Sequence, residues 1–208
     1  MKKIAVILAE GFEEIEALTV VDIMRRAGEH CDLVSVKGLE VTGAHNIKVI
    51  ADVLLSDEIK RYDLIVLPGG MPGSKNLKNN TDVIELVKYF NNQKKLISAI
   101  CAAPIVLAEA GIIKGKNITS YPGFEEELRD ANYKTEEKVV VDGNIITSRG
   151  PATAIEFACK LLEILGNESY KAISEGMMYD FLIQNSYPLG HPCGHPRGAP
   201  CGKFKIKV

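Results

Sequence analysis

Short apolar runs alternate with amphipathic segments along most of the chain. Residues 3–9 (KIAVILA) and 63–67 (DLIVL) are continuous apolar runs, which is typical of strands buried on both faces of a parallel sheet. Four further segments predict strands, of which the third is expected to be less central and the fourth short: residues 31–36, 96–100, 47–53 and 117–120.

Helical periodicity fills the intervals between these runs. The predicted helices cover residues 13–27, 81–91, a segment that follows the strand at 96–100 and ends at Ala110, 151–165, and 168–180. Residues 138–141 and 145–148 flank Asp142-Gly143-Asn144, a sequence that favours a β-hairpin. Strands that alternate with helices predict an α/β domain over residues 1–185 with a mostly parallel sheet.

The last segment, residues 186–208, has a different composition. It is rich in proline and glycine and lacks apolar periodicity, so we expect a mobile tail rather than a second domain. Four side chains in it are candidate zinc or copper ligands: His191, Cys193, His195 and Cys201. Their H-x-C-x-H core is not a standard closed-site spacing, so we predict neither a metal nor another cofactor for the function.

Composition and charge narrow the class of protein. The formal net charge of −2 over 208 residues argues against a dedicated nucleic-acid binder. No apolar run reaches the length of a membrane span, and the N-terminal run is followed by acidic residues rather than a signal-peptide cleavage site. The five cysteines are an odd number at scattered spacings, which favours reduced thiols in the cytoplasm.

Cys101 lies where an apolar strand becomes a helix, in the segment LISAICAAPIVLAEAG. A sharp strand-to-helix turn projects a side chain, and the unpaired N–H groups of a helix N-terminus favour a thiolate. Ala102 and Ala103 are small enough for such a crowded turn. Because ligands of open α/β sheets bind beyond the carboxyl ends of the strands, Cys101 is a candidate nucleophile.

Carboxylates are better placed than histidines to act as the proton-transfer partner of Cys101. Glu13 and Glu16 both fall on or beside the apolar face of the helix at 13–27, and the periodicity does not choose between them. Burial on that face raises a carboxyl pKa and suits proton transfer. No His-x-Glu pair follows Cys101, and His45, in a loop, is the only plausible histidine partner.

Pro68-Gly69-Gly70 ends another buried strand at the same predicted edge. Glycines there allow backbone N–H groups to approach a ligand or an oxyanion.

Five segments in this order resemble the ThiJ/PfpI superfamily, on the branch of the parkinsonism-associated deglycase "DJ-one" and its bacterial relatives: VILAEGFEEIEA, VDIMRRAG, DLIVLPGGMPG, AICAAP and ITSRGPATAIEFA. The resemblance implies a flavodoxin-like three-layer sandwich and a homodimer. It implies Cys101 as the reactive cysteine and Glu16 as its buried partner. It also implies oxyanion-type donors at Gly70 and Ala102, and places Arg149 near the site.

One position departs from the family pattern. Relatives with glyoxalase activity carry a histidine in the segment that matches ITSYP, where this chain has Tyr121. A tyrosine side chain is a poor base near neutral pH.

The resemblance implies three functions. The first is glyoxalase or deglycase chemistry on small reactive carbonyls or on glycated thiols and amines, through a Cys101 hemithioacetal with Glu16 as proton shuttle. The second is a redox sensor or stress chaperone that acts through a Cys101 sulfinate. A cysteine peptidase is the third, and the shortage of histidines favours it least.

Overall fold

The computed structural model describes residues 1–184. The segment 186–208, with the candidate cluster His191, Cys193, His195 and Cys201, lies outside the described residues. The strands are β1 (Lys3–Leu8), β2 (His30–Ser35), β3 (Glu40–Thr42), β4 (Lys48–Ile50), β5 (Val53–Leu54), β6 (Leu64–Leu67), β7 (Leu96–Ile100), β8 (Asn117–Ile118), β9 (Asn132–Tyr133), β10 (Val139–Asp142) and β11 (Ile145–Ser148). The α-helices are α1 (Glu14–Arg26), α2 (Gly73–Lys78), α3 (Thr81–Asn92), α4 (Pro104–Glu109), α5 (Ala154–Ile164), α6 (Tyr170–Gly176) and α7 (Tyr179–Gln184), and the 3₁₀ helices are η1 (Asp57–Arg61), η2 (Glu125–Leu128) and η3 (Pro151–Thr153).

Seven strands form the central sheet, in the order β10-β11-β7-β6-β1-β2-β5. All neighbouring pairs are parallel except β10 with β11, which form the predicted hairpin around Gly143 and Asn144. The mostly parallel sheet expected from the apolar runs is therefore confirmed. Because β1 lies between β2 and β6, the strand order reverses at β1, and the ends of β1, β6 and β7 meet at one edge of the sheet.

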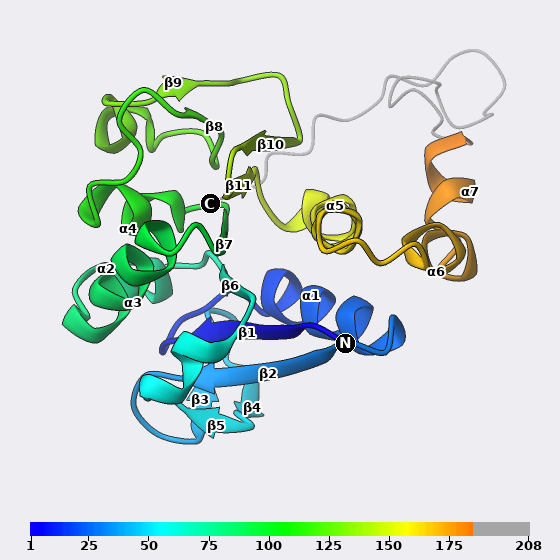
Figure 1. The fold of residues 1–208 in the computed structure, drawn as a ribbon, viewed down its shortest axis with the longest axis horizontal. Coiled ribbons are helices and arrows are strands. Elements are labelled where there is room, and N and C mark those ends of the chain that lie inside the picture. The colour runs from blue at the N-terminus through cyan, green and yellow to red at the C-terminus, as the bar shows by residue number, and fades with distance from the viewer. Residues whose placement is uncertain (185–208) are drawn as a thin grey trace, which may run out of the picture.

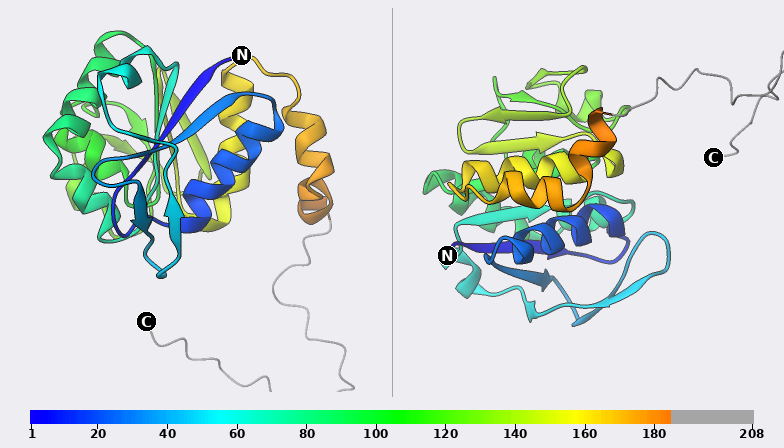
Figure 2. Two further views of the ribbon diagram at one scale, coloured as in Figure 1. Left: turned by 90° about the horizontal axis from the view of Figure 1, so that it is seen from below. Right: turned by 90° about the vertical axis from the view of Figure 1, so that its right-hand side faces the viewer.

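Helices cover both faces of the sheet (Figures 1 and 2). Alternate residues of β1 explain why, since Ile4, Val6 and Leu8 pack into the core beneath α1 and α5. Ala5 and Ile7 pack into the other core, beneath α2, α3 and α4. β1 is apolar from Ile4 to Leu8 and is thus buried on two faces, as the sequence pattern predicts. α6 and α7 lie outside α5 (Figure 2).

Three predicted elements differ in the structure. The strand expected at 47–53 is split into β4, in a small sheet with β3, and β5, at the edge of the central sheet. Asp52 lies between them, and its carboxylate accepts a 2.8 Å hydrogen bond from the Leu33 N–H. The helix expected at 168–180 is two helices, broken at Met178, whose φ of 61° is left-handed. The helix expected at 151–165 begins as the 3₁₀ turn η3, and the short helix α2 escaped prediction.

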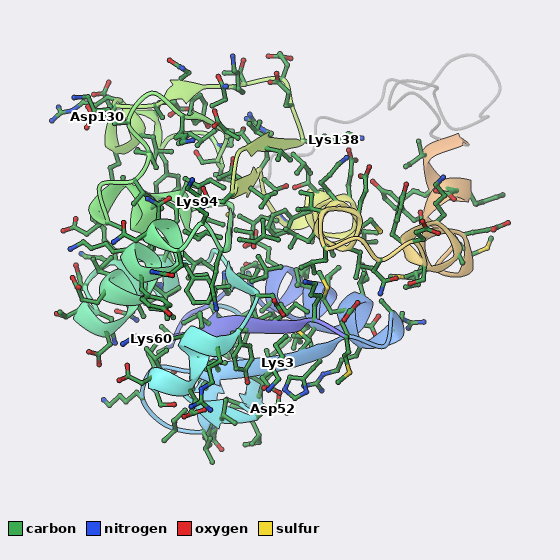
Figure 3. The ribbon with its side chains drawn as sticks, in the orientation of Figure 1. Lys3, Asp52, Lys60, Lys94, Asp130 and Lys138 are labelled. Atoms are coloured by element: carbon green, nitrogen blue, oxygen red, sulfur yellow. The ribbon has the colours of Figure 1, made fainter. Side chains whose placement is uncertain are left out.

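Charged side chains are spread around the molecule rather than gathered on one element. Figure 3 shows Asp52 near β5, at one end of the sheet, and Asp130 and Lys138 near its other end.

Among residues 1–184, every helix is too short or too polar to cross a membrane.

Candidate active site

Cys101 occupies a strained turn at the end of β7. Its φ is 62°, a left-handed conformation that is uncommon for a residue with a side chain. Two backbone hydrogen bonds hold it there. The Cys101 N–H donates to the Ser148 carbonyl of β11 at 3.0 Å, and the Tyr121 N–H donates to the Cys101 carbonyl at 2.9 Å. The turn therefore fixes the sulfur at the carboxyl edge of the sheet.

Glu16, in the first turn of α1, lies beside that sulfur with no exposed surface. Its Oε2 accepts a 2.7 Å hydrogen bond from the Gly69 N–H, and its carboxyl group hydrogen-bonds the Cys101 thiol. Its Oε1 is buried with no hydrogen-bond partner among the described residues. Burial outweighs these bonds and raises the pKa of Glu16 to about 7, so its proton exchanges near neutral pH.

The Cys101 thiol is held in its protonated form when Glu16 is ionised. Burial, followed by the neighbouring Glu16 carboxylate, raises the pKa of the thiol to about 12. Hydrogen bonds from the Gly70 and Ala102 backbone act in the opposite direction. The backbone N–H groups at the start of the helix therefore lower the thiol pKa, as the sequence predicts, but desolvation and a like charge outweigh them. A proton on Glu16 removes the like charge that opposes ionisation of the thiol.

Gly69 is the site residue whose role the sequence did not reveal. A Cβ built on Gly69 would lie 2.5 Å from the Cys101 Cβ and 2.6 Å from Glu16 Oε2. The next residue, Gly70, has a φ of 88° and no room for a side chain against the backbone of Phe12 and Glu13. The only sequence signal was the glycine pair at the end of a buried strand.

A cavity of about 470 Å³ opens over the sulfur, and we call it the Cys101 cavity. Its lining includes Glu13, His45, Gly70, Cys101, Ala102 and Tyr121. It is large enough for a small metabolite, and it contains a nucleophile, backbone donors and titratable side chains.

The family model for DJ-1/PfpI proteins matches residues 2–164 of this chain. The chain belongs to the DJ-1/PfpI family.

Individual DJ-1 proteins match over most of the chain. Protein dj-1beta of Drosophila melanogaster is 39% identical over 181 residues, which cover 85% of this chain and 97% of that protein. Its crystal structure superposes with a TM-score of 0.81 at 38% identity, covering 85% of this chain and 97% of that one. Parkinson disease protein 7 homolog of Danio rerio is 41% identical over 169 residues, or 79% of this chain and 89% of that protein. The flavodoxin-like fold and the family resemblance predicted from sequence are confirmed.

Two further DJ-1 proteins are also similar to this chain. A solved structure of oxidized Toxoplasma gondii DJ-1 has a TM-score of 0.79 and 36% identity, covering 86% of this chain and 98% of that one. Protein DJ-1 homolog B of Arabidopsis thaliana is 40% identical over 177 residues, covering 83% of this chain but only 40% of that longer protein.

The other residues singled out in the sequence lie in different places in this DJ-1/PfpI site. Tyr121 lines the Cys101 cavity and is half-exposed. The Arg149 guanidinium donates to the Thr135 carbonyl at 2.6 Å and to Thr119 Oγ1 at 3.3 Å. Arg149 therefore braces the loops around the site and is not among the described residues that line the cavity.

His45 lines the cavity, but Cys101 is not its hydrogen-bond partner. Its Nδ1 lies 2.9 Å from Glu14 Oε2 and 3.6 Å from Glu13 Oε2. The ligand atoms of these three side chains lie within 4.8 Å of one another, close enough to surround one cation. The Glu14–His45 hydrogen bond accounts for the arrangement without a metal. The sequence proposed Glu13 as an alternative to Glu16 but gave no sign of its pairing with His45.

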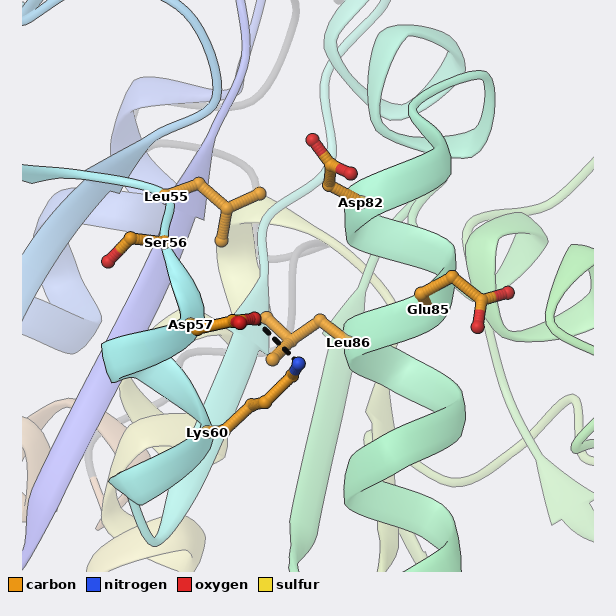
Figure 4. Close-up of a pocket in the computed structure, with 7 residues that line it drawn as sticks. All are labelled: Leu55, Ser56, Asp57, Lys60, Asp82, Glu85 and Leu86. Atoms are coloured by element: carbon orange, nitrogen blue, oxygen red, sulfur yellow. Dashed lines mark ion pairs between the residues drawn. The ribbon is translucent and has the colours of Figure 1, made fainter.

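A second cavity, of about 290 Å³, lies between η1 and α3 (Figure 4). Asp57, Asp82 and Glu85 are among its lining residues, and Lys60 forms a 2.6 Å ion pair with Asp57. The described residues that line this second cavity include no cysteine or histidine. It therefore offers no nucleophile comparable to Cys101.

Proposed function

We propose that this chain is a cytoplasmic stress-response protein that converts small reactive dicarbonyls, such as methylglyoxal and glyoxal, into hydroxy acids without a cofactor. The observation that carries the proposal is the contact between the buried Glu16 carboxyl and the thiol of Cys101, which lines the cavity. A carboxyl group whose pKa is about 7 can both accept and return a proton at neutral pH.

The first step is addition of the Cys101 sulfur to the aldehyde carbon. The thiol proton passes to Glu16, the S–C bond forms, and the carbonyl π electrons move to oxygen, which becomes an alkoxide. The backbone N–H groups of Gly70 and Ala102, which already contact the sulfur, are the donors suited to stabilise that oxygen. Protonation of the alkoxide gives a hemithioacetal.

The second step moves a proton between adjacent carbons. Ionised Glu16 removes the hydrogen from the former aldehyde carbon, giving an enediol, and a proton then returns to the neighbouring carbon. The product is a 2-hydroxyacyl thioester on Cys101, and its hydrolysis releases lactate when the substrate is methylglyoxal. One carbon is oxidised and its neighbour is reduced, so the sequence requires no external oxidant or reductant. The same addition to glycated thiols or amines would constitute deglycase activity.

The test is methylglyoxal conversion to lactate by wild type, Cys101→Ser and Glu16→Gln. Both variants should lose about 10² to 10⁴ in rate, the usual contribution of a positioned acid–base group. Cys159→Ser is the matched control, since Cys159 lies on α5, away from the cavity. Lactate formation that survives in Cys101→Ser would refute the proposal.

Redox sensing is the second candidate function. Among the three cysteines of residues 1–184, Cys101 is half-buried beside a cavity and Cys31 and Cys159 are buried, so of these three peroxide should reach Cys101 first. The backbone donors of Gly70 and Ala102 could hold sulfinate oxygens, and the relative from Toxoplasma gondii has been solved in an oxidized form. Mild peroxide followed by peptide mapping tests this, and oxidation of Cys159, Cys193 or Cys201 before Cys101 would contradict it.

The geometry gives least support to a cysteine peptidase. That mechanism needs an imidazole on the sulfur to form the nucleophile. Among the described residues the sulfur is paired with Glu16, and the ring of His45 is paired with Glu14.

A further inference from the structure

His45 is fixed in place at the solvent side of the Cys101 cavity by Glu14. Glu14 is buried at the start of α1, and its carboxylate accepts 2.8 Å and 2.9 Å hydrogen bonds from the His45 backbone N–H and ring Nδ1. The two bonds fix both the loop and the ring, although the His45 side chain is 67% exposed.

This pairing also sets which ring nitrogen can act. An ionised carboxylate beside Nδ1 requires the hydrogen to be on that nitrogen, so in the neutral ring the lone pair is on Nε2. A carboxylate behind Nδ1 and a free lone pair on Nε2 are the features of an oriented general base.

Glu16 and His45 lie in opposite environments in the same site. Glu16 has no exposed surface and is covered by Gly69, which suits proton transfer next to the sulfur. Hydrolysis of an acyl-cysteine instead needs a water molecule from the solvent side. His45 is the exposed base that lines this cavity.

We propose that His45, oriented by Glu14, is the general base that activates water for hydrolysis of an acyl group on Cys101. This inference rests on the proposed function, because it assigns the hydrolytic half of that reaction. In this step Nε2 accepts a proton as the water oxygen bonds to the acyl carbon. The C–S bond then breaks, the sulfur takes the proton, and the carboxylic acid and free thiol are released.

Several titratable groups face His45 or share its cavity. Glu13 and Glu14 face the ring from the start of α1, and Cys101 and Tyr121 line the cavity with it. The hydrogen bond to Glu14, with the charges of both glutamates, raises the pKa of His45. Deacylation should therefore accelerate with pH through an ionisation above the ordinary histidine value. Glu13→Gln should move that ionisation to lower pH, because it removes one of the two carboxylates that face the ring.

The experiment measures deacylation alone. Cys101 is acetylated with p-nitrophenyl acetate, excess reagent is removed, and loss of the acetyl mass is followed across pH by intact-protein mass spectrometry. His45→Gln should deacylate about a hundredfold more slowly and lose the pH dependence, as expected for a missing general base. His30→Gln is the matched control, because His30 also pairs with a carboxylate, Asp32 at 2.9 Å, but outside the cavity.

A second measurement uses methylglyoxal. His45→Gln should accumulate a Cys101 thioester that hydroxylamine releases, whereas wild type should not. Equal deacylation by His45→Gln and His30→Gln, or failure of both reagents to acylate wild-type Cys101, would overturn the inference.

The two proposals can fail separately. If wild type makes lactate through Cys101 while His45→Gln deacylates normally, only the role of His45 falls. If acetyl-Cys101 hydrolysis depends on His45 but Cys101→Ser still converts methylglyoxal, only the dicarbonyl function falls.

Discussion

The Gly69 N–H donates a 2.7 Å hydrogen bond to Glu16, 53 residues earlier in the chain. The Glu16 carboxyl group lies so close to Gly69 that position 69 has no room for a side chain. The contact joins the end of β6 to the first turn of α1. It holds a buried acid against the nucleophile, and the first two predictions follow from it.

Glu16→Gln should change how stability depends on pH. The pKa of Glu16 is raised from 4.5 to about 7 on folding, so the native state binds more protons than the unfolded state in that interval. The free energy of unfolding of wild type should therefore fall as pH rises from 4.5 to 7. The loss is about 3 kcal/mol at 1.36 kcal/mol per pKa unit. Urea unfolding at several pH values should show this slope in wild type and its absence in Glu16→Gln; parallel curves would contradict it.

Gly69→Ala should destabilise the fold and disturb the site. The added methyl would overlap Cys101 and Glu16, and overpacking of this kind typically costs about 1–3 kcal/mol. Gly176→Ala is the control, because its Cβ would meet nothing within 4 Å. Thermal unfolding and methylglyoxal turnover measure the two effects. A Gly69→Ala protein as stable and active as Gly176→Ala would show that the crowding is relieved by small shifts.

Tyr121→His should increase methylglyoxal turnover near neutral pH. An imidazole is a far better base there than a phenol, and residue 121 lines the Cys101 cavity. A tenfold or larger gain in kcat, at a position where Tyr121→Phe has little effect, is the expected result. Equal rates for the histidine and phenylalanine variants would indicate that position 121 takes no part in proton transfer.

Ile50→Lys should convert the expected homodimer into a monomer. Ile15, Ile47 and Ile50 are exposed apolar side chains on α1 and on the segment leading through β4. The Ile47 N–H reaches Glu14 Oε1 at 3.4 Å, which joins these two segments. Burying a charged side chain in an apolar interface costs more free energy than leaving it exposed on the surface. Light scattering should show the halved mass, while Val141→Lys, on β10 at the far edge of the sheet, should leave it unchanged.

Local sequence patterns predicted most of the fold. Apolar runs such as that of β1 are so continuous that only burial on both faces accommodates them, which predicts a parallel sheet between helices. The predictions failed where a single long-range contact overrides periodicity. The Asp52 carboxylate, bonded to Leu33, interrupts a strand that the sequence reads as one segment.

The sequence by itself also determined the components of the candidate site. Cys101 follows an apolar strand, Glu13 and Glu16 both fall on or beside the buried face of a helix, and the Gly69-Gly70 pair ends a second strand, all of which are local signals. The choice of Glu16 over Glu13 came from the family resemblance. Only the tertiary structure decided how they work together. In it, the Gly69 N–H donates a hydrogen bond to Glu16, and the His45 ring pairs with Glu14. Burial also outweighs the backbone N–H groups of the helix N-terminus in setting the pKa of Cys101. Such effects depend on distances between segments far apart in the chain and on the solvent they exclude, and no local pattern encodes either quantity.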